Sequence, residues 1–171
     1  MAQNNIAFSN KSLEFLQVCT EFCKYVEHLG NVERDEFIDV MRGLLSMLYL
    51  KATLFPELNE QEGYNEPHVT EDDYNFIRRN VAHILAEKDD YLDVFIQDFK
   101  YADQPILRTI SEGIADIYQV LRDLTETYKG GYEEAIEVAL YDTMDAFKTY
   151  WGQTSLNTLK ALHDARFNLS E

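Results

Sequence analysis

The chain has 171 residues and a formal charge of −16, from 31 acidic against 15 basic residues. A chain of this length predicts one domain that buries enough surface to fold without a disulfide or a structural metal. Because Lys and Arg neutralise phosphate groups, the charge argues against a nucleic-acid-binding protein and against binding to an anionic membrane surface.

The sequence also predicts a soluble, cytoplasmic protein. Its first seven residues have neither a basic leader nor an apolar run of signal-peptide length. The most apolar window, residues 44–55, spans 12 residues and contains Lys51, whereas a membrane-spanning helix needs about 20 apolar residues. Cys19 and Cys23 lie four positions apart on the apolar face of a predicted helix, so we expect both to be buried free thiols.

The first part of the chain predicts a tail and two helices. Residues 1–11 are expected to form a flexible tail, followed by a helix over residues 12–29 that ends at Gly30-Asn31. A second helix is expected over residues 33–55. Apolar residues cover nearly all sides of its second half, a pattern typical of a helix in the middle of a bundle.

A long acidic loop and a third helix follow. Residues 56–69 are acidic, contain glycine and proline, and show no helical period. Connections of such length are often functional or disordered. Thr70, with Asp73 three residues later, resembles a capping box and predicts the start of a helix that reaches Leu85.

The centre of the chain predicts a short helix and then a long one. Asp89-Asp90 is expected to cap a short helix that holds Tyr91, Leu92, Val94, Phe95 and Phe99. From residue 105 to residue 128 the sequence sorts, at about 100° per residue, into an apolar arc and an opposite polar row. Pro105 fits the first turn of this long helix. The polar row consists of Glu112, Asp116, Gln119 and Asp123.

Two further helices complete the chain. Gly130-Gly131 predicts the end of the long helix. A sixth helix is expected over residues 132–151, and Gly152 is expected to separate it from a seventh over residues 154–167. No segment alternates like a strand between hairpin turns. The sequence therefore predicts an all-α, single-domain bundle of about seven helices.

Four segments dispersed along the chain occur in a recognisable order. They read LYLKA at residues 48–52 with Pro56-Glu57 after it, DYLDVF at 90–95, SEGIADIYQ at 111–119, and YWG at 150–152 through ALH at 161–163. In these segments the chain resembles an uncharacterised bacterial family, frequent in Bacteroidetes-type bacteria and catalogued only as a domain of unknown function. The resemblance covers most of residues 12–167. It implies a small, all-helical, cytoplasmic protein and carries over no particular activity.

The chain departs from the family pattern at Gly113, where a better helix former is expected. Glycine inside a helix costs roughly 1 kcal/mol relative to alanine. A residue without a Cβ also permits close packing of a neighbouring helix, and it leaves the adjacent acidic row in place.

The acidic row is the strongest candidate for metal chemistry. Helical bundles bind divalent metals through carboxylates from several helices, often with a Glu-x-x-His pair, which this chain lacks. The simpler interpretation of Glu112 and Asp116 is a solvated helix face. The alternative is a hydrolase in which these two residues, with Asp90 or Asp93 from another helix, hold magnesium or manganese and activate water.

A non-enzymatic interaction or regulatory module that needs no cofactor is the main prediction. The sequence contains no phosphate-binding glycine loop, zinc pattern or nucleophile elbow. Its 11 tyrosines suit protein interfaces and half-buried bundle rims alike. We expect the partner to be a basic protein or a second copy of the chain. The candidate pocket or interface residues are Tyr49, Tyr91, Tyr118, Trp151 and His163.

Overall fold

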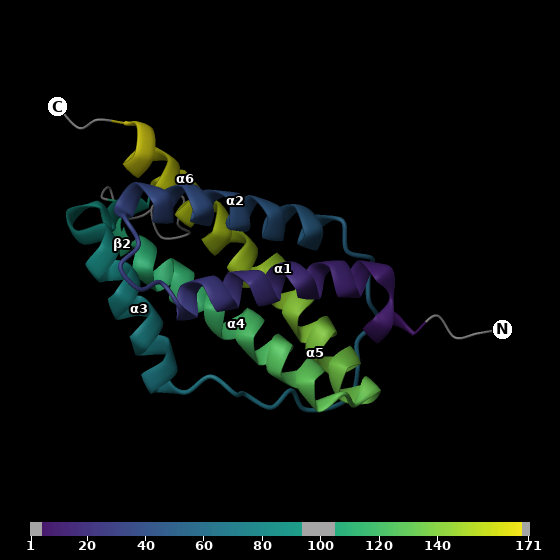
Figure 1. Cartoon of the computed structure of the whole chain (residues 1–171). Helices are drawn as coiled ribbons and strands as arrows, with labels where there is room; N and C mark the ends of the chain where they lie inside the picture. The colour runs from purple at the N-terminus through teal and green to yellow at the C-terminus, as the bar shows by residue number, and fades with distance from the viewer. Residues whose placement is uncertain (1–4, 94–104, 169–171) are drawn as a thin grey trace.

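The computed structural model describes residues 5–93 and 105–168, which form a mainly helical bundle (Figure 1). Its α-helices are α1 (Asn10–Glu27), α2 (Arg34–Thr53), α3 (Glu71–Leu85), α4 (Ile110–Gly130), α5 (Glu133–Ala146) and α6 (Gly152–Phe167). The short 3-10 turns are η1 (Ile6–Phe8) and η2 (Ala86–Lys88). Strands β1 (Asp90–Asp93) and β2 (Ile106–Thr109) pair in antiparallel orientation. The predicted all-α, single-domain character is confirmed.

Helix α4 occupies the centre of the bundle. It contacts α1, α3, α5 and α6, and its apolar arc is completely or almost completely buried at Ile110, Ile114, Ile117, Leu121 and Leu124. Complete burial of a side chain of this size stabilises the fold by about 1.5–3 kcal/mol. The apolar arc predicted over residues 105–128 therefore faces the core, from residue 110 onward.

Helix α2 is more peripheral than its sequence predicts. It packs on α1, α3 and α6 and buries one face. The expectation of a central helix is wrong, because the other side of α2 remains exposed. The large apolar side chains on that side are Val40, Met47, Leu50 and Leu54.

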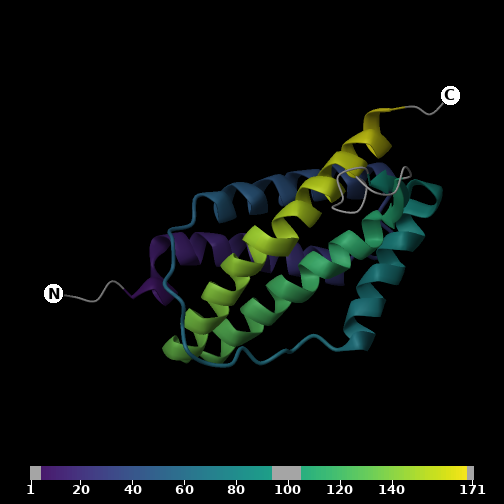
Figure 2. The same ribbon diagram turned by 180° about the vertical axis from the view of Figure 1, so that it is seen from behind.

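The last two helices form one continuous rod, seen in front in Figure 2. A π-helical turn, η4 (Phe147–Trp151), joins α5 directly to α6. The predicted break at Gly152 is wrong. Glycine is needed there for a different reason, since a Cβ at position 152 would collide with the backbone oxygen of Phe147. Within the described residues the α-helices number six, in five rods, rather than seven.

The segment before α4 is not helical where it is described. Residues 90–93 form β1, paired with β2 in the register Asp90 to Thr109, so the short helix predicted after Asp89-Asp90 is wrong there, as is the predicted absence of strands. The rest of that predicted helix, including Val94, Phe95 and Phe99, lies outside the described residues. The β-branched residues Ile106 and Thr109 favour the extended backbone of β2.

The start of α4 is determined by capping rather than by Pro105. The helix begins at Ile110, five residues later than predicted. The Thr109 hydroxyl accepts the N–H of Glu112 at 3.2 Å. The buried carboxylate of Asp89 accepts the N–H of Ser111 at 2.7 Å and its hydroxyl at 2.6 Å. These acceptors satisfy N–H groups that the first turn of a helix leaves without partners.

Two local predictions are confirmed. Thr70 and Asp73 form a capping box at the start of α3, and Gly131 ends α4 in the left-handed conformation with φ 73°.

The start of the chain differs from its prediction. Residues 5–11, expected to lie in a flexible tail, instead include η1 and the start of α1. The Tyr128 hydroxyl holds this segment by donating to the carbonyl of buried Ala7 at 2.7 Å.

The connection between α2 and α3 runs along the length of the bundle (Figures 1 and 2). Residues 56–69 contain no helix or strand. Among the described residues, η1 and the last turn of α6 lie at opposite ends of the molecule. None of the helices in the described ranges combines the length and the apolar character that a membrane span requires.

Candidate functional site

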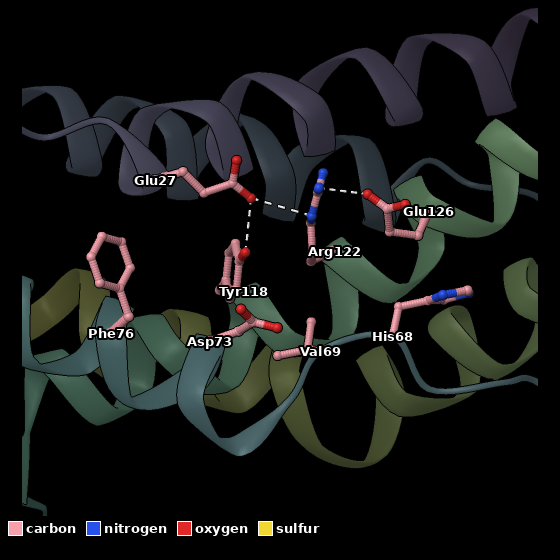
Figure 3. A pocket seen from close by; sticks show the side chains of 8 residues that line it. All are labelled: Glu27, His68, Val69, Asp73, Phe76, Tyr118, Arg122 and Glu126. Carbon is pink, nitrogen blue, oxygen red and sulfur yellow. Dashed lines mark hydrogen bonds and ion pairs between the residues drawn. The ribbon is translucent and has the colours of Figure 1, made fainter.

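A pocket of about 490 Å³ opens between α1, α3 and α4 (Figure 3). Helix α1 contributes its last residue, the connection to α3 contributes two residues, and α3 and α4 contribute the rest. The lining residues are Glu27, His68, Val69, Asp73, Phe76, Tyr118, Arg122 and Glu126.

The spacing of residues on α4 brings one side of the pocket together. Tyr118, Arg122 and Glu126 are four positions apart in succession, which places them on the same face of the helix. That face is directed toward the end of α1, where the chain places Glu27.

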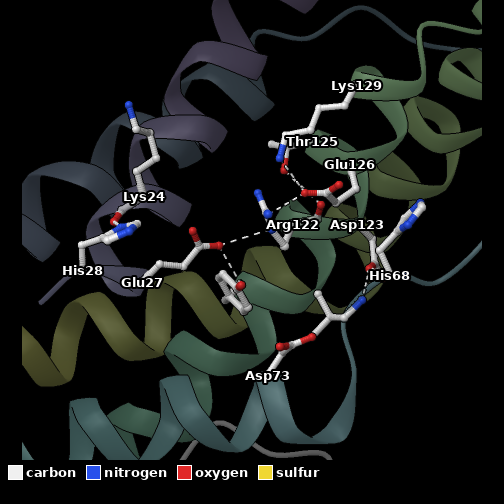
Figure 4. A network of polar contacts seen from close by, with 12 residues as sticks. Lys24, Glu27, His28, His68, Asp73, Arg122, Asp123, Thr125, Glu126 and Lys129 are labelled. Carbon is white, nitrogen blue, oxygen red and sulfur yellow. Dashed lines mark hydrogen bonds and ion pairs between the residues drawn. The ribbon is translucent and has the colours of Figure 1, made fainter.

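Arg122 lies between two carboxylates (Figure 4). Its Nε is 3.2 Å from Glu27 Oε1 and its Nη2 is 2.5 Å from Glu126 Oε1. The Tyr118 hydroxyl donates to the same Glu27 oxygen at 2.8 Å, and Lys129 Nζ donates to Glu126 at 2.7 Å. The network therefore links α1 to α4 through charge-assisted hydrogen bonds.

The network shifts two of its titratable groups in opposite directions. The hydrogen bond from Lys129, assisted by the charge of Arg122, lowers the pKa of Glu126. Burial, together with the hydrogen bond to Glu27, raises the pKa of Tyr118 well above 10.0. At neutral pH Glu126 is an anion and Tyr118 is a hydrogen-bond donor.

A carboxylate of α4 fixes the other side of the pocket. Asp123 Oδ1 accepts the backbone N–H groups of His68 and Val69, both at 2.8 Å. The capping box then leads directly into α3, and the backbone hydrogen bond from Thr70 lowers the pKa of Asp73. The end of the loop is thus held at a defined position beside Tyr118 and Arg122 (Figure 3).

The chain that leads into the pocket is strongly acidic. Residues 57–73, called the acidic segment below, contain seven Asp and Glu residues and no Lys or Arg. Inside the pocket three carboxylates accompany one guanidinium, and the Phe76 ring at its edge is half exposed. Such a site can accept a cationic group carried on an aliphatic stem.

The polar row of α4 is not a uniformly solvated face. Glu112 and Gln119 are exposed, but Asp123 holds the loop and Asp116 accepts two hydroxyl groups. Tyr74 of α3 donates to Asp116 Oδ1 at 2.7 Å, and Tyr150 of η4 donates to Oδ2 at 2.5 Å. Burial and the bond to Asp116 raise the pKa of Tyr150 to about 12.

Two of the four carboxylates considered for a metal, Asp116 and Asp93, have other partners in the structure. Both oxygens of Asp116 accept tyrosine hydroxyls, and buried Asp93 lies 2.7 Å from Arg108 Nε. Asp90 is exposed at the start of β1, and Glu112 is exposed on α4. Within residues 5–93 and 105–168 no three His, Cys, Asp or Glu side chains are grouped so that they could hold a metal ion.

The five candidate pocket or interface residues do not line one pocket, although Tyr49 and Trp151 both contact the Phe147 ring. Tyr118 lines the pocket described above, while Tyr49 lines another cavity of about 350 Å³ and contacts the Phe147 ring. Trp151 is completely buried and donates to the Thr143 carbonyl at 2.8 Å. Tyr91 is half-buried on β1, and His163 is exposed on α6 beside the Phe167 ring.

Most of the residues that line the pocket are not among the candidates predicted from the sequence. Glu27, Asp73, Phe76 and Arg122 come from three helices and meet only in the folded chain. The regular spacing of Tyr118, Arg122 and Glu126 beside the apolar arc is the one signal that sequence alone offered.

Known proteins resemble this chain over nearly its whole length. The chain is similar to protein BF1032 from Bacteroides fragilis, a structural genomics target whose crystal structure is known, with 34% sequence identity and a TM-score of 0.85. The match covers 96% of this chain and 98% of that chain. No curated protein matches the chain. The family model described as "Domain of unknown function (DUF5063)" matches residues 7–168, which confirms the resemblance found in the dispersed segments. The chain belongs to the DUF5063 family.

Proposed function

We propose that this protein is a non-enzymatic interaction module that binds a basic segment of a protein partner. The binding site consists of the acidic segment and the pocket at its end. The observation that carries the proposal is the composition of this region, where three carboxylates and one arginine line the pocket beside an exposed phenylalanine. The acidic segment supplies seven acidic positions, one of which, Asp73, lies in the pocket itself.

A lysine or arginine side chain of a partner fits this arrangement. The charge of Arg122 is already balanced by Glu27 and Glu126, so Asp73 and the acidic segment provide the excess negative charge. The Phe76 ring offers a surface for the aliphatic stem and a cation–π contact, which contributes about 0.5–1 kcal/mol at an exposed site.

The charge of the whole chain supports the same function. A formal charge of −16 attracts a basic partner over long range and accelerates its association, and salt weakens this attraction. The proposal requires no cofactor. It includes a cytoplasmic setting, in keeping with the two free thiols, Cys19 and Cys23, which are buried in the core.

The proposal is tested with a fluorescently labelled lysine-rich peptide and a glutamate-rich peptide of equal length. We expect anisotropy to show binding of the lysine-rich peptide alone, with an affinity that falls as salt rises. Phe76→Ala should weaken binding by roughly fivefold, the equivalent of about 1 kcal/mol.

A pair of matched double variants separates the site from the general charge. Glu71→Gln with Asp72→Asn removes two charges from the first turn of α3, and Glu133→Gln with Glu134→Gln removes two from the first turn of α5. All four side chains are exposed. Only the α3 variant should lose affinity strongly; equal losses in both would contradict a localised site.

A further inference from the structure

The exposed side of α2 carries an apolar stripe along most of the helix. The stripe, called the α2 stripe below, consists of Val40, Gly43, Met47, Leu50 and Leu54. Their spacing of three and four residues places them within one narrow arc of the helix surface. The four large side chains are 36% to 54% exposed, so the described residues of the chain leave a large part of the stripe open to solvent.

Gly43 has no evident role inside the monomer. It lies in the interior of α2, where glycine costs roughly 1 kcal/mol relative to alanine. A Cβ at this position would meet nothing within 4 Å, and the backbone of Gly43 is not in the left-handed region. Neither close packing within the chain nor backbone conformation therefore requires this glycine.

Beside Gly43 the surface is hollowed. A groove of about 640 Å³ runs between α2 and α6 and shares Gly43 with the α2 stripe. Its apolar lining includes Leu156 and Leu159 of α6. Apolar side chains protrude further along the same helix, at Met47, Leu50 and Leu54, so this face has a ridge and a hollow next to each other.

The charges of this face are balanced, in contrast to the chain as a whole. Helix α2 has three acidic and three basic residues, and none of the acidic ones follows Asp39. Helix α6 has Lys160 and Arg166 against Asp164. The groove itself is lined by two acidic and two basic side chains. The face itself therefore adds little to the long-range repulsion between two molecules of charge −16.

We propose that two copies of this chain pair through the α2 stripe and the α2–α6 groove. A two-fold axis near Met47 sets the two α2 helices antiparallel, and the ridge of each copy then enters the hollow at Gly43 of the other. Such isologous contacts bury the same patch on both subunits. The all-round apolar character of α2 is thereby explained, because the helix becomes internal in the dimer. A basic partner has no preference for this balanced face.

The test measures the mass of the purified full chain by sedimentation equilibrium over a series of protein concentrations. We expect a reversible equilibrium between the 20.0 kDa chain and a species of twice that mass. Added salt should strengthen this dimer by screening the net repulsion, whereas it weakens binding of the basic peptide. A wild-type chain that remains monomeric throughout the series would overturn the proposal.

Two variants locate the interface. Gly43→Leu fills the hollow and Leu50→Glu places a charge on the ridge; each should raise the dimer dissociation constant by about tenfold or more. Leu107→Glu on β2, at a leucine that is 63% exposed, is the matched control and should dimerise like the wild type. If Gly43→Leu and Leu50→Glu leave the dimer intact, or if the control also disrupts it, the interface lies elsewhere and the proposal is wrong.

Misfolding is distinguished by a second measurement on the same variants. Because space is open around Gly43 and leucine favours helices, Gly43→Leu should keep the wild-type circular dichroism spectrum. At concentrations where the wild type is monomeric, it should unfold at a temperature equal to or above that of the wild type. A stable variant that no longer dimerises can then only have lost the contact between copies.

Discussion

The role of Asp116 in the structure differs from both roles that the sequence suggests for it. In the sequence it stands in a polar row that resembles either a solvated face or part of a metal site. In the structure it receives hydroxyl groups from α3 and from η4, so it joins three elements of the bundle. Neither tyrosine is near Asp116 in the sequence, and no local pattern predicts such a contact.

The hydrogen bond from Tyr150 should give stability a measurable dependence on alkaline pH. The pKa of Tyr150 is raised from 10.0 to about 12 by burial and by Asp116. In the unfolded chain tyrosine ionises near its ordinary value, so the stabilising contribution is complete below about pH 10 and is lost as the pH rises toward 12.

Urea unfolding of the wild type and of Tyr150→Phe across this pH range measures the effect. We expect the variant to be less stable at neutral pH and the two curves to converge above pH 10. Tyr132→Phe, at an exposed tyrosine outside this contact, is the control. A difference between wild type and Tyr150→Phe that stays constant with pH would contradict the assignment.

At the scale of elements, helices with a clear apolar period are predicted well and the connections between them are not. The faces of α4, the capping box of α3 and the end at Gly131 depend on residues that are close in sequence. The start of α4 depends instead on Asp89, which binds Ser111 more than twenty residues further along the chain. The sheet depends on the pairing of two strands that residues 94–104 separate in the sequence. Local periodicity contains no information about either.

The candidate site follows the same division. Sequence spacing aligns Tyr118, Arg122 and Glu126, whereas Glu27 and Phe76 reach the pocket only through helix packing. Asp123 illustrates the reason: its partners are backbone N–H groups of His68 and Val69, and such groups are present at nearly every position of a chain. A sequence cannot mark which of them a distant carboxylate will bind.

Substitution of two glycines inside helices, Gly113 and Gly43, should change the free energy of unfolding in opposite directions. A Cβ at Gly113 would collide with Thr158 Oγ1 where α4 and α6 pack closely, whereas a Cβ at Gly43 would meet nothing within 4 Å. Gly113→Ala should therefore lower the free energy of unfolding by about 1–3 kcal/mol, despite the better helix propensity of alanine. Gly43→Ala should raise it by about 0.5–1 kcal/mol.

Chemical denaturation of both variants, at protein concentrations where the chain is monomeric, tests this contrast. Thr158→Ala combined with Gly113→Ala serves as the control, since it removes the oxygen that the new Cβ meets. The double variant should recover part of the lost stability. A Gly113→Ala protein as stable as the wild type would contradict the close approach of α4 and α6.

At the scale of the whole molecule, the excess of negative charge raises the question of divalent metals. Because Asp116 is bonded to two tyrosines and Asp93 to Arg108, we expect magnesium and manganese to leave the unfolding temperature unchanged relative to EDTA at matched ionic strength. A specific metal at about 100 times its dissociation constant would add about 2.7 kcal/mol, or several degrees for a chain of this size.

Differential scanning fluorimetry with each metal measures this shift, and Asp116→Asn provides the comparison. A rise of several degrees that disappears in Asp116→Asn would favour the metal-dependent hydrolase over the interaction module. A small rise shared by wild type and variant would reflect non-specific association of the divalent ion with the excess of surface carboxylates.

The π-helical turn between α5 and α6 has a consequence for insertions and deletions. A π turn holds one residue more than an α turn, and each residue of a helix rotates the residues after it by about 100°. The turn at Phe147–Trp151 therefore determines which face of α6 meets the core, so that Ser155, Thr158 and Leu162 are buried. Loss of one residue here would turn all of α6, and with it the groove beside α2, out of alignment. Loss of one residue in the long connection before α3 would leave every helix facing as before.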